Sequence, residues 1–192
     1  MDNCDDAGLI WKRQGGESLL ETPVFSVEGV RELSPQGEER RYYIIGAADW
    51  VTVIPLLESG KFVMVRQWRH GEGRVNVEFP GGVINPGESP REGARRELLE
   101  ETGYTPGELV PLGTLNPNPA LFTNRHHFFL ARELSNTGSL HLDDDEFLRP
   151  LVEDPETVWD RICSGEYSHA LMAACAFLYR RYEESHPRRQ GI

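Results

Sequence analysis

Hydrophobic and polar residues alternate in short stretches near the start of the chain. The alternation over Phe25–Leu33 is typical of a half-buried strand, and residues 41–45 form a second strand candidate after the turn signal at residues 34–37. These two strands predict a hairpin inside a small N-terminal β-subdomain, residues 1–46. Because so short a piece buries too little surface to be stable alone, we expect it to pack on the rest of the chain or on a second subunit.

Denser hydrophobic runs follow between residues 47 and 185, and the first two runs predict strands joined by a turn. Strands and helices interleaved in one chain predict an α/β fold in which a mixed sheet lies between helices. The polar residues 186–192 are expected to form a flexible tail. The expected strands span residues 50–57, 61–66, 109–115 and 127–131, and the expected helices span residues 153–164 and 168–184.

A further helix is predicted by the signals at its two ends. Ser89 and Glu92 have the spacing of a capping box, and Pro90 stands at the first helical position, where proline is tolerated. Gly103 predicts the left-handed residue that commonly ends a helix. The helix is therefore expected between Ser89 and Gly103.

Three carboxylates project from one side of this predicted helix, because Glu97, Glu100 and Glu101 are spaced three and four residues apart. Like charges at this spacing repel each other by roughly 0.2–0.5 kcal/mol per exposed pair, so such a face is either solvated or occupied by cations. Mg²⁺ takes oxygen ligands in octahedral geometry, and glycine at Gly81 allows the main chain to approach an ion closely. The sequence predicts a site for Mg²⁺, with Mn²⁺ as the alternative, at this face.

The whole stretch resembles the Nudix box, in which fixed glycine, glutamate and arginine positions recur over 23 residues. The resemblance implies the Nudix α/β/α sandwich and metal-dependent hydrolysis of a nucleoside diphosphate linked to another moiety. It implies metal ligands at Glu97, Glu100, Glu101 and the main chain of Gly81, and catalytic roles for Arg96, Glu100 and Glu101, with Arg96 linking Glu88 to the acidic face. The fixed positions are filled by Gly82, Glu88, Arg96, Glu97, Leu98, Glu100, Glu101, Gly103 and Tyr104.

Outside the box the resemblance is narrower, covering roughly residues 50–181. Residues 65–69, Val-Arg-Gln-Trp-Arg, followed by residues 77–82, are similar to the Nudix branch that hydrolyses ADP-ribose and nucleotide sugars. In that branch the basic strand end faces the diphosphate. Arg66 and Arg69 are therefore candidate phosphate-binding residues, since the guanidinium fork suits phosphate; the alternative is an exposed strand end.

Aromatic residues near these strands are candidates for substrate contacts. Trp50 and Trp68 are each able to stack on a base, although a Trp beside a Val-rich strand is often a core residue. No catalytic role is expected for His126 or His127.

Two loops complete the set of candidates. Residues 115–121 contain Asn-Pro-Asn-Pro where ADP-ribose hydrolases of the branch carry a Ser-Pro-Gly-like loop, and this version resembles the nucleotide-sugar hydrolases, which makes Asn118 a candidate for substrate binding. The acidic residues 143–146 lie where the branch carries a glutamate-rich loop that supplies a metal ligand or a base. Asp145 and Glu146 are the first candidates; a solvated loop is the alternative.

Composition narrows the possible partners. The net charge of −11 over 192 residues argues against a nucleic-acid binder that uses a basic surface, whereas metal ions can supply positive charge for a polyanionic substrate. Cys4, Cys163 and Cys175 have no paired spacing and are interpreted as free thiols in a reducing cytosol. No secretory signal is recognised at the start, and no apolar run approaches the roughly 20 residues of a membrane helix, so a cytoplasmic protein is expected.

Three functions compete for this sequence. The first is hydrolysis of the pyrophosphate bond of ADP-ribose or a nucleoside diphosphate sugar, giving a nucleoside monophosphate and a sugar phosphate. The second is hydrolysis of nucleoside triphosphates or dinucleoside polyphosphates, and the third is a non-catalytic domain that senses nucleotide sugars. All box glutamates are present, which favours an enzyme, and the branch is commonly homodimeric, so a homodimer is expected.

Overall fold

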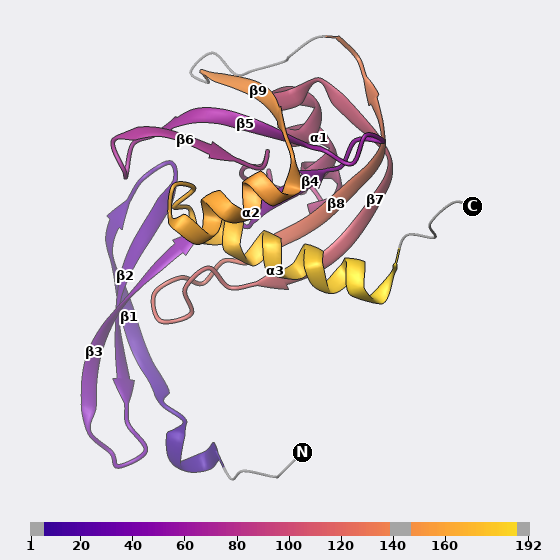
Figure 1. Ribbon diagram of the computed structural model, residues 1–192. Helices are drawn as coiled ribbons and strands as arrows, with labels where there is room; N and C mark the ends of the chain where they lie inside the picture. The colour runs from indigo at the N-terminus through magenta and orange to yellow at the C-terminus, as the bar shows by residue number, and fades with distance from the viewer. Residues whose placement is uncertain (1–5, 139–146, 188–192) are drawn as a thin grey trace. The chain divides into compact units, whose positions relative to one another are not determined.

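The structure is a computed structural model that describes residues 6–138 and 147–187, and it contains two compact units (Figure 1). The predicted division at residue 46 stays a prediction, and residues 188–192 of the predicted tail lie outside the described residues. The N-terminal unit comprises the chain up to Ala48 together with Asn116–Arg125, and the central unit comprises Asp49–Leu115 and the chain from His126 onward.

The N-terminal unit is built on a three-stranded antiparallel sheet in the order β1-β2-β3. The predicted hairpin is confirmed as β2 and β3, because the two predicted strands pair with each other. The sequence did not predict β1, whose two glycines and many charged residues break the alternation expected of a strand. The elements are a 3₁₀ helix at Asp6–Leu9, β1 (Lys12–Glu21), β2 (Phe25–Leu33) and β3 (Glu39–Ala47).

Six strands of the central unit form two three-stranded sheets. The first sheet contains β4 (Trp50–Pro55), β8 (His126–Asn136) and β7 (Tyr104–Leu115), and the second contains β6 (Arg74–Glu78), β5 (Phe62–Arg69) and β9 (Leu148–Glu153), each in that order. In the first sheet β4 runs parallel to β8 while β7 runs antiparallel to it, so the predicted mixed sheet is confirmed. The two predicted runs at residues 50–57 and 61–66 are both strands, but they belong to different sheets.

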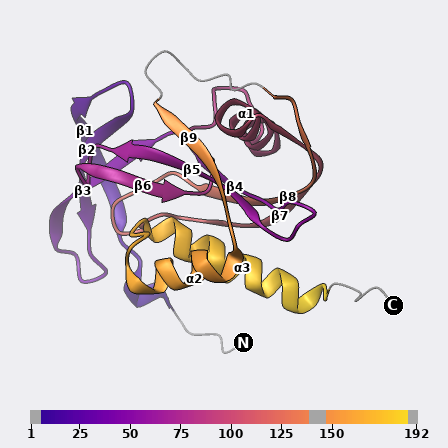
Figure 2. The ribbon, with the colours of Figure 1, turned by 45° about the horizontal axis from the view of Figure 1, so that its top comes forward.

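Helices cover both sides of the mixed sheet, with α1 on one side and α2 and α3 on the other (Figure 2). Side chains alternate between the two faces of a strand. Val51 and Val53 of β4 therefore pack toward α1, whereas Ile54 packs toward α2 and α3. This arrangement confirms the predicted α/β/α sandwich. The helices are α1 (Pro90–Thr102), α2 (Pro155–Ser164) and α3 (Ala170–Ser185).

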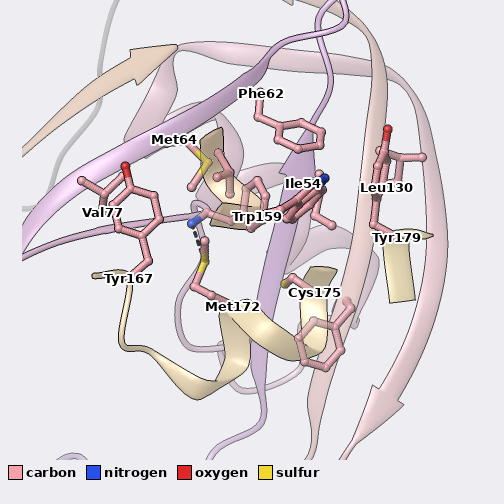
Figure 3. Packing of buried hydrophobic residues seen from close by; sticks show 13 residues of the cluster. Ile54, Phe62, Met64, Val77, Leu130, Trp159, Tyr167, Met172, Cys175 and Tyr179 are labelled. Carbon is pink, nitrogen blue, oxygen red and sulfur yellow. Dashed lines mark hydrogen bonds between the residues drawn. The ribbon is translucent and has the colours of Figure 1, made fainter. Parts of the chain in front are cut away.

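A cluster of aromatic rings attaches α2 and α3 to the second sheet (Figure 3). The ring of Phe62 in β5 meets those of Phe79, Trp159 and Tyr179 edge-on, with centroids 5.4, 5.3 and 5.2 Å apart. Such pairs stabilise a core by roughly 0.5–1.5 kcal/mol each beyond the surface that they bury. The dashed line in Figure 3 ends at Met172, whose Sδ accepts a hydrogen bond from the backbone N–H of Phe79 at 3.2 Å.

The ends of α1 follow the sequence signals. Ser89 Oγ accepts a hydrogen bond from Glu92 N at 3.3 Å, and the Glu92 carboxylate accepts one from Ser89 N at 2.8 Å, so the predicted capping box is confirmed. Gly103 ends the helix with a φ of 73°, in the left-handed region that suits glycine. No helix within the described residues is both long and apolar enough to cross a membrane.

Candidate active site

Arg96 connects the acidic residues around α1. Its Nε and Nη2 each donate a hydrogen bond of 3.0 Å to Glu88, and its Nη1 donates hydrogen bonds of 2.9 Å to both Glu97 and Glu100. Nη2 also reaches the carbonyl of Val83 at 2.8 Å. Hydrogen bonds from Arg96 lower the pKa of the Glu88 carboxyl below its usual value. The expected link from Glu88 to the acidic face is thus present.

The loop before α1 brings its backbone against two of the glutamates. Glu101 Oε2 accepts a hydrogen bond of 2.8 Å from Gly81 N, and a Cβ at Gly82 would lie 2.5 Å from Glu97 Oε1. A Cβ at Gly81 would collide with the carbonyl of Val51. Glycine is therefore required at Gly81 by the close backbone, and Gly82 lets the Glu97 carboxylate lie against the loop.

The buried carboxylates of α1 are suited to a hard cation. Glu97 is 6% exposed and Glu101 is 2% exposed, and burying a carboxylate is costly unless it is paired or binds a metal ion. Oxygen donors of this kind fit a divalent ion such as Mg²⁺. Within residues 6–138 and 147–187, however, no three acidic, His or Cys side chains are already gathered in the arrangement of a metal site.

A cavity of about 540 Å³ lies next to this loop, within the usual size range of ligand pockets. Gly81 and Gly82 form one edge of it, so the cavity borders the loop that contacts Glu97 and Glu101. The side chains that line it are mainly aromatic or charged, and they come from β4, β5, β6, β8 and the start of α3. The lining side chains that bear on the chemistry are those of Trp50, Trp68, Arg69, Asn76, Glu78, His126 and His169.

Glu78 is the centre of a charged wall in this cavity. Arg69 donates to both Glu78 oxygens, at 3.0 Å from Nε and 2.7 Å from Nη2, and His169 Nδ1 lies 2.9 Å from Glu78 Oε2. Burial of Glu78 acts to raise its pKa, but hydrogen bonds from His169 and Arg69 outweigh this effect and bring the pKa to about 2. Glu78 is therefore an ionised acceptor at neutral pH. We call Glu78, Arg69 and His169 the charged wall.

A second carboxylate that lines the cavity, Glu72, connects the same segments. Glu72 accepts hydrogen bonds from Ser168 at 2.5 Å, from Arg74 at 2.7 Å and from Asn76 at 3.0 Å. These hydrogen bonds lower the pKa of Glu72 to about 2, and the bond from Ser168 has the largest effect. They connect the turn between β5 and β6 with the chain that leads into α3.

His126 is a buried neutral residue of the cavity. Its Nε2 lies 2.8 Å from Thr52 Oγ1, and its ring meets that of Trp50 at 6.0 Å between centroids. Burial is the largest cause that lowers the pKa of His126 to about 3, and the neighbouring His169 and His127 lower it further. His126 is therefore a neutral imidazole at pH 7, and its ring supports Trp50.

The structure brings together some of the predicted substrate-binding residues. Trp50, Trp68 and Arg69 line the cavity, with Trp68 half exposed. Arg66 lies on the exposed side of β5 and is not among the lining residues. Asn118 belongs to the N-terminal unit, where its backbone carbonyl and side chain accept hydrogen bonds that close the turn of its own loop. Asp145 and Glu146 lie outside the described residues.

Two residues of the charged wall were not predicted from the sequence. Glu78 directly precedes the Phe-Pro-Gly-Gly segment, and its position at a strand end beside a glycine loop was an available signal. His169 had no such signal, because its partner lies 91 positions earlier in the chain. Only the three-dimensional structure brings these two residues together.

A mixed sheet between helices, with a glycine loop held against buried glutamates of one helix, defines an α/β/α sandwich with an acidic site beside a cavity. The chain belongs to the Nudix family, since the pattern of the NUDIX domain matches residues 48–159. The predictions of the family, of the fold and of an enzyme are thereby confirmed. Nudix hydrolases generally use divalent metals.

The chain is also similar to individual hydrolases of ADP compounds. The chain is 37% identical over 152 residues to the ADP-ribose pyrophosphatase of Bacillus subtilis, covering 79% of this chain and 82% of that protein. It is 28% identical over 169 residues to the ADP compounds hydrolase NudE of Escherichia coli, covering 86% and 89%. Its fold matches a crystal structure of an ADP compounds hydrolase with a TM-score of 0.83 and 25% identity, covering 93% of this chain and 96% of that one.

Proposed function

We propose that this chain hydrolyses the pyrophosphate bond of ADP-ribose or a related nucleoside diphosphate sugar, with Mg²⁺, giving a nucleoside monophosphate and a sugar phosphate. The observation that carries the proposal is the cavity whose edge is the Gly81–Gly82 backbone, in contact with the buried Glu97 and Glu101. The same reaction class appears in the names of the relatives from Bacillus subtilis and Escherichia coli, and it agrees with the prediction made from the sequence.

The proposed site residues fall into two groups, one that binds the metal ion and one that binds the substrate. Glu97, Glu100 and Glu101, with the main chain of Gly81, are the proposed ligands of Mg²⁺, which when bound offsets phosphate charge and activates water. Arg96 keeps Glu97 and Glu100 oriented through its paired hydrogen bonds.

The cavity is proposed to hold the organic part of the substrate. Trp50 and Trp68 offer aromatic surfaces for stacking, and Arg69 supplies positive charge at the wall. Arg66 and Asn118 stay candidates for phosphate and substrate binding, and Asp145 and Glu146 stay candidates for a further metal ligand or base. A cytoplasmic location likewise stays a prediction.

An assay with a substrate panel tests the reaction. Purified protein is incubated with Mg²⁺ and, separately, with ADP-ribose, GDP-mannose, other nucleotide sugars, nucleoside triphosphates and dinucleoside polyphosphates, and phosphate-ester products are followed. The proposal expects the highest kcat/KM for ADP-ribose or a nucleotide sugar. Preference for the triphosphates or the dinucleoside polyphosphates would overturn it, and Mn²⁺ in place of Mg²⁺ identifies the better ion.

We also propose that the N-terminal unit joins two copies of this chain in a homodimer. The unit exposes large apolar side chains on its strands, and such surfaces commonly mark interaction sites. Trp11 packs edge-on against Tyr42 at 5.4 Å, and both rings are partly exposed. The exposed apolar residues of β1 and β3 include Leu19, Leu20, Tyr42 and Tyr43.

Two variants test this dimer by light scattering after gel filtration. Deleting the first 45 residues is expected to give a monomer, and the full-length Tyr43→Glu variant is expected to weaken the dimer by placing charge on its apolar surface. A dimer that persists unchanged in both variants would rule out this role of the N-terminal unit.

A further inference from the structure

His169 is an unusual residue for its position at the start of α3. It is the N-cap residue of α3, where Ser, Thr, Asp and Asn are preferred, and its side chain makes no capping hydrogen bond. The side chain instead lines the cavity and is 38% exposed. The position therefore places an imidazole in the cavity and contributes no side-chain cap to the helix.

Glu78 determines which ring nitrogen of His169 carries hydrogen. An ionised carboxylate only accepts hydrogen bonds, so the Nδ1 that lies 2.9 Å from Glu78 Oε2 must be the donor. In the neutral ring Nε2 is then an acceptor. Within the described part of the chain Nε2 makes no hydrogen bond. A neutral His169 thus presents a single acceptor to a ligand.

The orientation of this imidazole is set before any ligand binds. Glu78 is itself held by two nearly parallel hydrogen bonds from Arg69, a geometry that restricts rotation of the carboxylate. Arg69 comes from β5, Glu78 from β6 and His169 from the start of α3, so three elements fix one ring. Carboxylates orient histidines in the same way at metal and catalytic sites. A side chain that is already ordered loses little conformational entropy when a ligand binds to it.

The cavity contains further polar atoms that lack partners. Asn76 is 6% exposed and His126 is 3% exposed, and both line the cavity. Asn76 Oδ1 and His126 Nδ1 are buried without a hydrogen-bond partner within residues 6–138 and 147–187. Buried polar atoms of this kind are satisfied by ordered water or by a polar ligand. The cavity is therefore suited to a ligand with hydrogen-bonding groups.

We propose that His169 is a specificity-determining residue whose Nε2 accepts a hydrogen bond from a hydroxyl or amino group of the substrate. A phosphate oxygen is an acceptor and does not pair with an acceptor nitrogen, so the recognised group belongs to a sugar or to the base. The inference rests on the proposed function. It adds that the charged wall recognises the organic part of the substrate, while the carboxylates of α1 act on the diphosphate through Mg²⁺.

Two substitutions of His169 distinguish the roles of its two ring nitrogens. His169→Asn keeps an amide donor near the place of Nδ1 and removes Nε2, whereas His169→Gln places an amide oxygen near the place of Nε2. Loss of one neutral hydrogen bond corresponds to roughly a fivefold to tenfold change. His169→Asn is expected to raise KM for ADP-ribose by that factor with kcat within about twofold, and His169→Gln to restore KM to within about threefold.

Substrate analogues identify the donor group. The panel consists of ADP-ribose analogues that each lack one hydroxyl of either ribose, together with the hypoxanthine analogue, which lacks the amino group of the base. The KM penalty of His169→Asn is expected to disappear for one analogue, as in a double-mutant cycle. A deoxy analogue would identify a sugar hydroxyl, and the hypoxanthine analogue would identify the base.

Several outcomes overturn the inference. One is an unchanged KM in His169→Asn, another is an equal KM rise in His169→Asn and His169→Gln, and a third is a penalty that persists with every analogue. His186→Asn is the matched control, since His186 lies at the other end of α3 and does not line the cavity, and its KM is expected to match the wild type. A wild-type enzyme inactive on all these diphosphates would instead refute the proposed function, and the inference with it.

Discussion

The acidic face of α1 and the charged wall of the cavity both pair glutamates with an arginine, but their partners come from different distances along the chain. Around α1, Arg96 contacts Glu88, Glu97 and Glu100, all within eight positions. In the wall, Arg69 and Glu78 lie nine positions apart on paired strands, and His169 joins them from 91 positions away.

This difference explains how each region is suited to its proposed task. The α1 face is defined by one helix and one adjoining loop, so its geometry persists wherever that local motif folds. The wall depends on the packing of β5, β6 and α3, so its geometry requires the tertiary fold. We therefore expect the α1 face to provide the chemistry and the wall to provide selectivity among substrates.

The largest expected effect tests the α1 face. Glu101→Gln keeps an oxygen that accepts the hydrogen bond from Gly81 N but removes the negative charge proposed to bind Mg²⁺. We expect turnover to fall by on the order of a hundredfold or more, while the melting temperature stays close to that of the wild type. Steady-state kinetics and calorimetry measure the two quantities. Full turnover at saturating Mg²⁺ would refute the role of Glu101.

An intermediate effect tests the wall through its pH dependence. The pKa of Glu78 is lowered from 4.5 to about 2 in the folded protein, so Glu78 stabilises the fold above pH 4.5 and this stabilisation is lost as the pH falls through about 2. Glu78→Gln is expected to lower the free energy of unfolding at pH 7 by on the order of 3 kcal/mol. The difference from the wild type should shrink between pH 5 and pH 2.

Urea unfolding of the wild type and the variant at pH 7, 4 and 2.5 measures this difference. Glu72→Gln is the matched control, because the pKa of Glu72 is also lowered to about 2 but its side chain is 39% exposed. A smaller loss is expected for the control because solvent screens exposed charges. A difference between Glu78→Gln and the wild type that is independent of pH would contradict the ion pairing assigned to the wall.

The smallest expected effect concerns Arg66, which shares a strand with the wall but does not line the cavity. If Arg66 contacts phosphate, Arg66→Ala should raise KM by roughly threefold to fivefold and leave kcat nearly unchanged. The loss should decrease at high salt, because screening weakens exposed charge interactions. An unchanged KM at low salt would restrict phosphate binding to the residues of the cavity and of α1.

Local signals predicted α1 and its acidic face from the sequence, because capping, helix periodicity and the Nudix box all act within about 23 residues. The strands with clear alternation, such as β2, were predicted for the same reason. β1 and β9 were not, since they carry few apolar residues in alternation and are strands because of the neighbours with which they pair. β6 was also missed, because Val75 and Val77 alternate with polar residues over only five positions.

The charged wall was inaccessible to sequence reasoning for a related reason. Arg69 was a candidate for phosphate binding, but its hydrogen bonds to Glu78 follow from the pairing of β5 with β6. The contact of His169 with Glu78 depends on where α3 begins relative to the second sheet. Contacts between distant positions form only in the tertiary structure, and no local sequence pattern predicts them.

The alternation of Val51, Val53 and Ile54 in β4 limits where this enzyme can tolerate changes of length. Inserting or deleting a single residue there would exchange the side chains that face α1 with those that face α2 and α3. It would also misalign the hydrogen bonds from Val51 and Val53 to the loop that holds Glu97 and Glu101. Engineered or natural insertions should therefore accumulate in turns away from the cavity, such as residues 58–60, while β4 keeps its length.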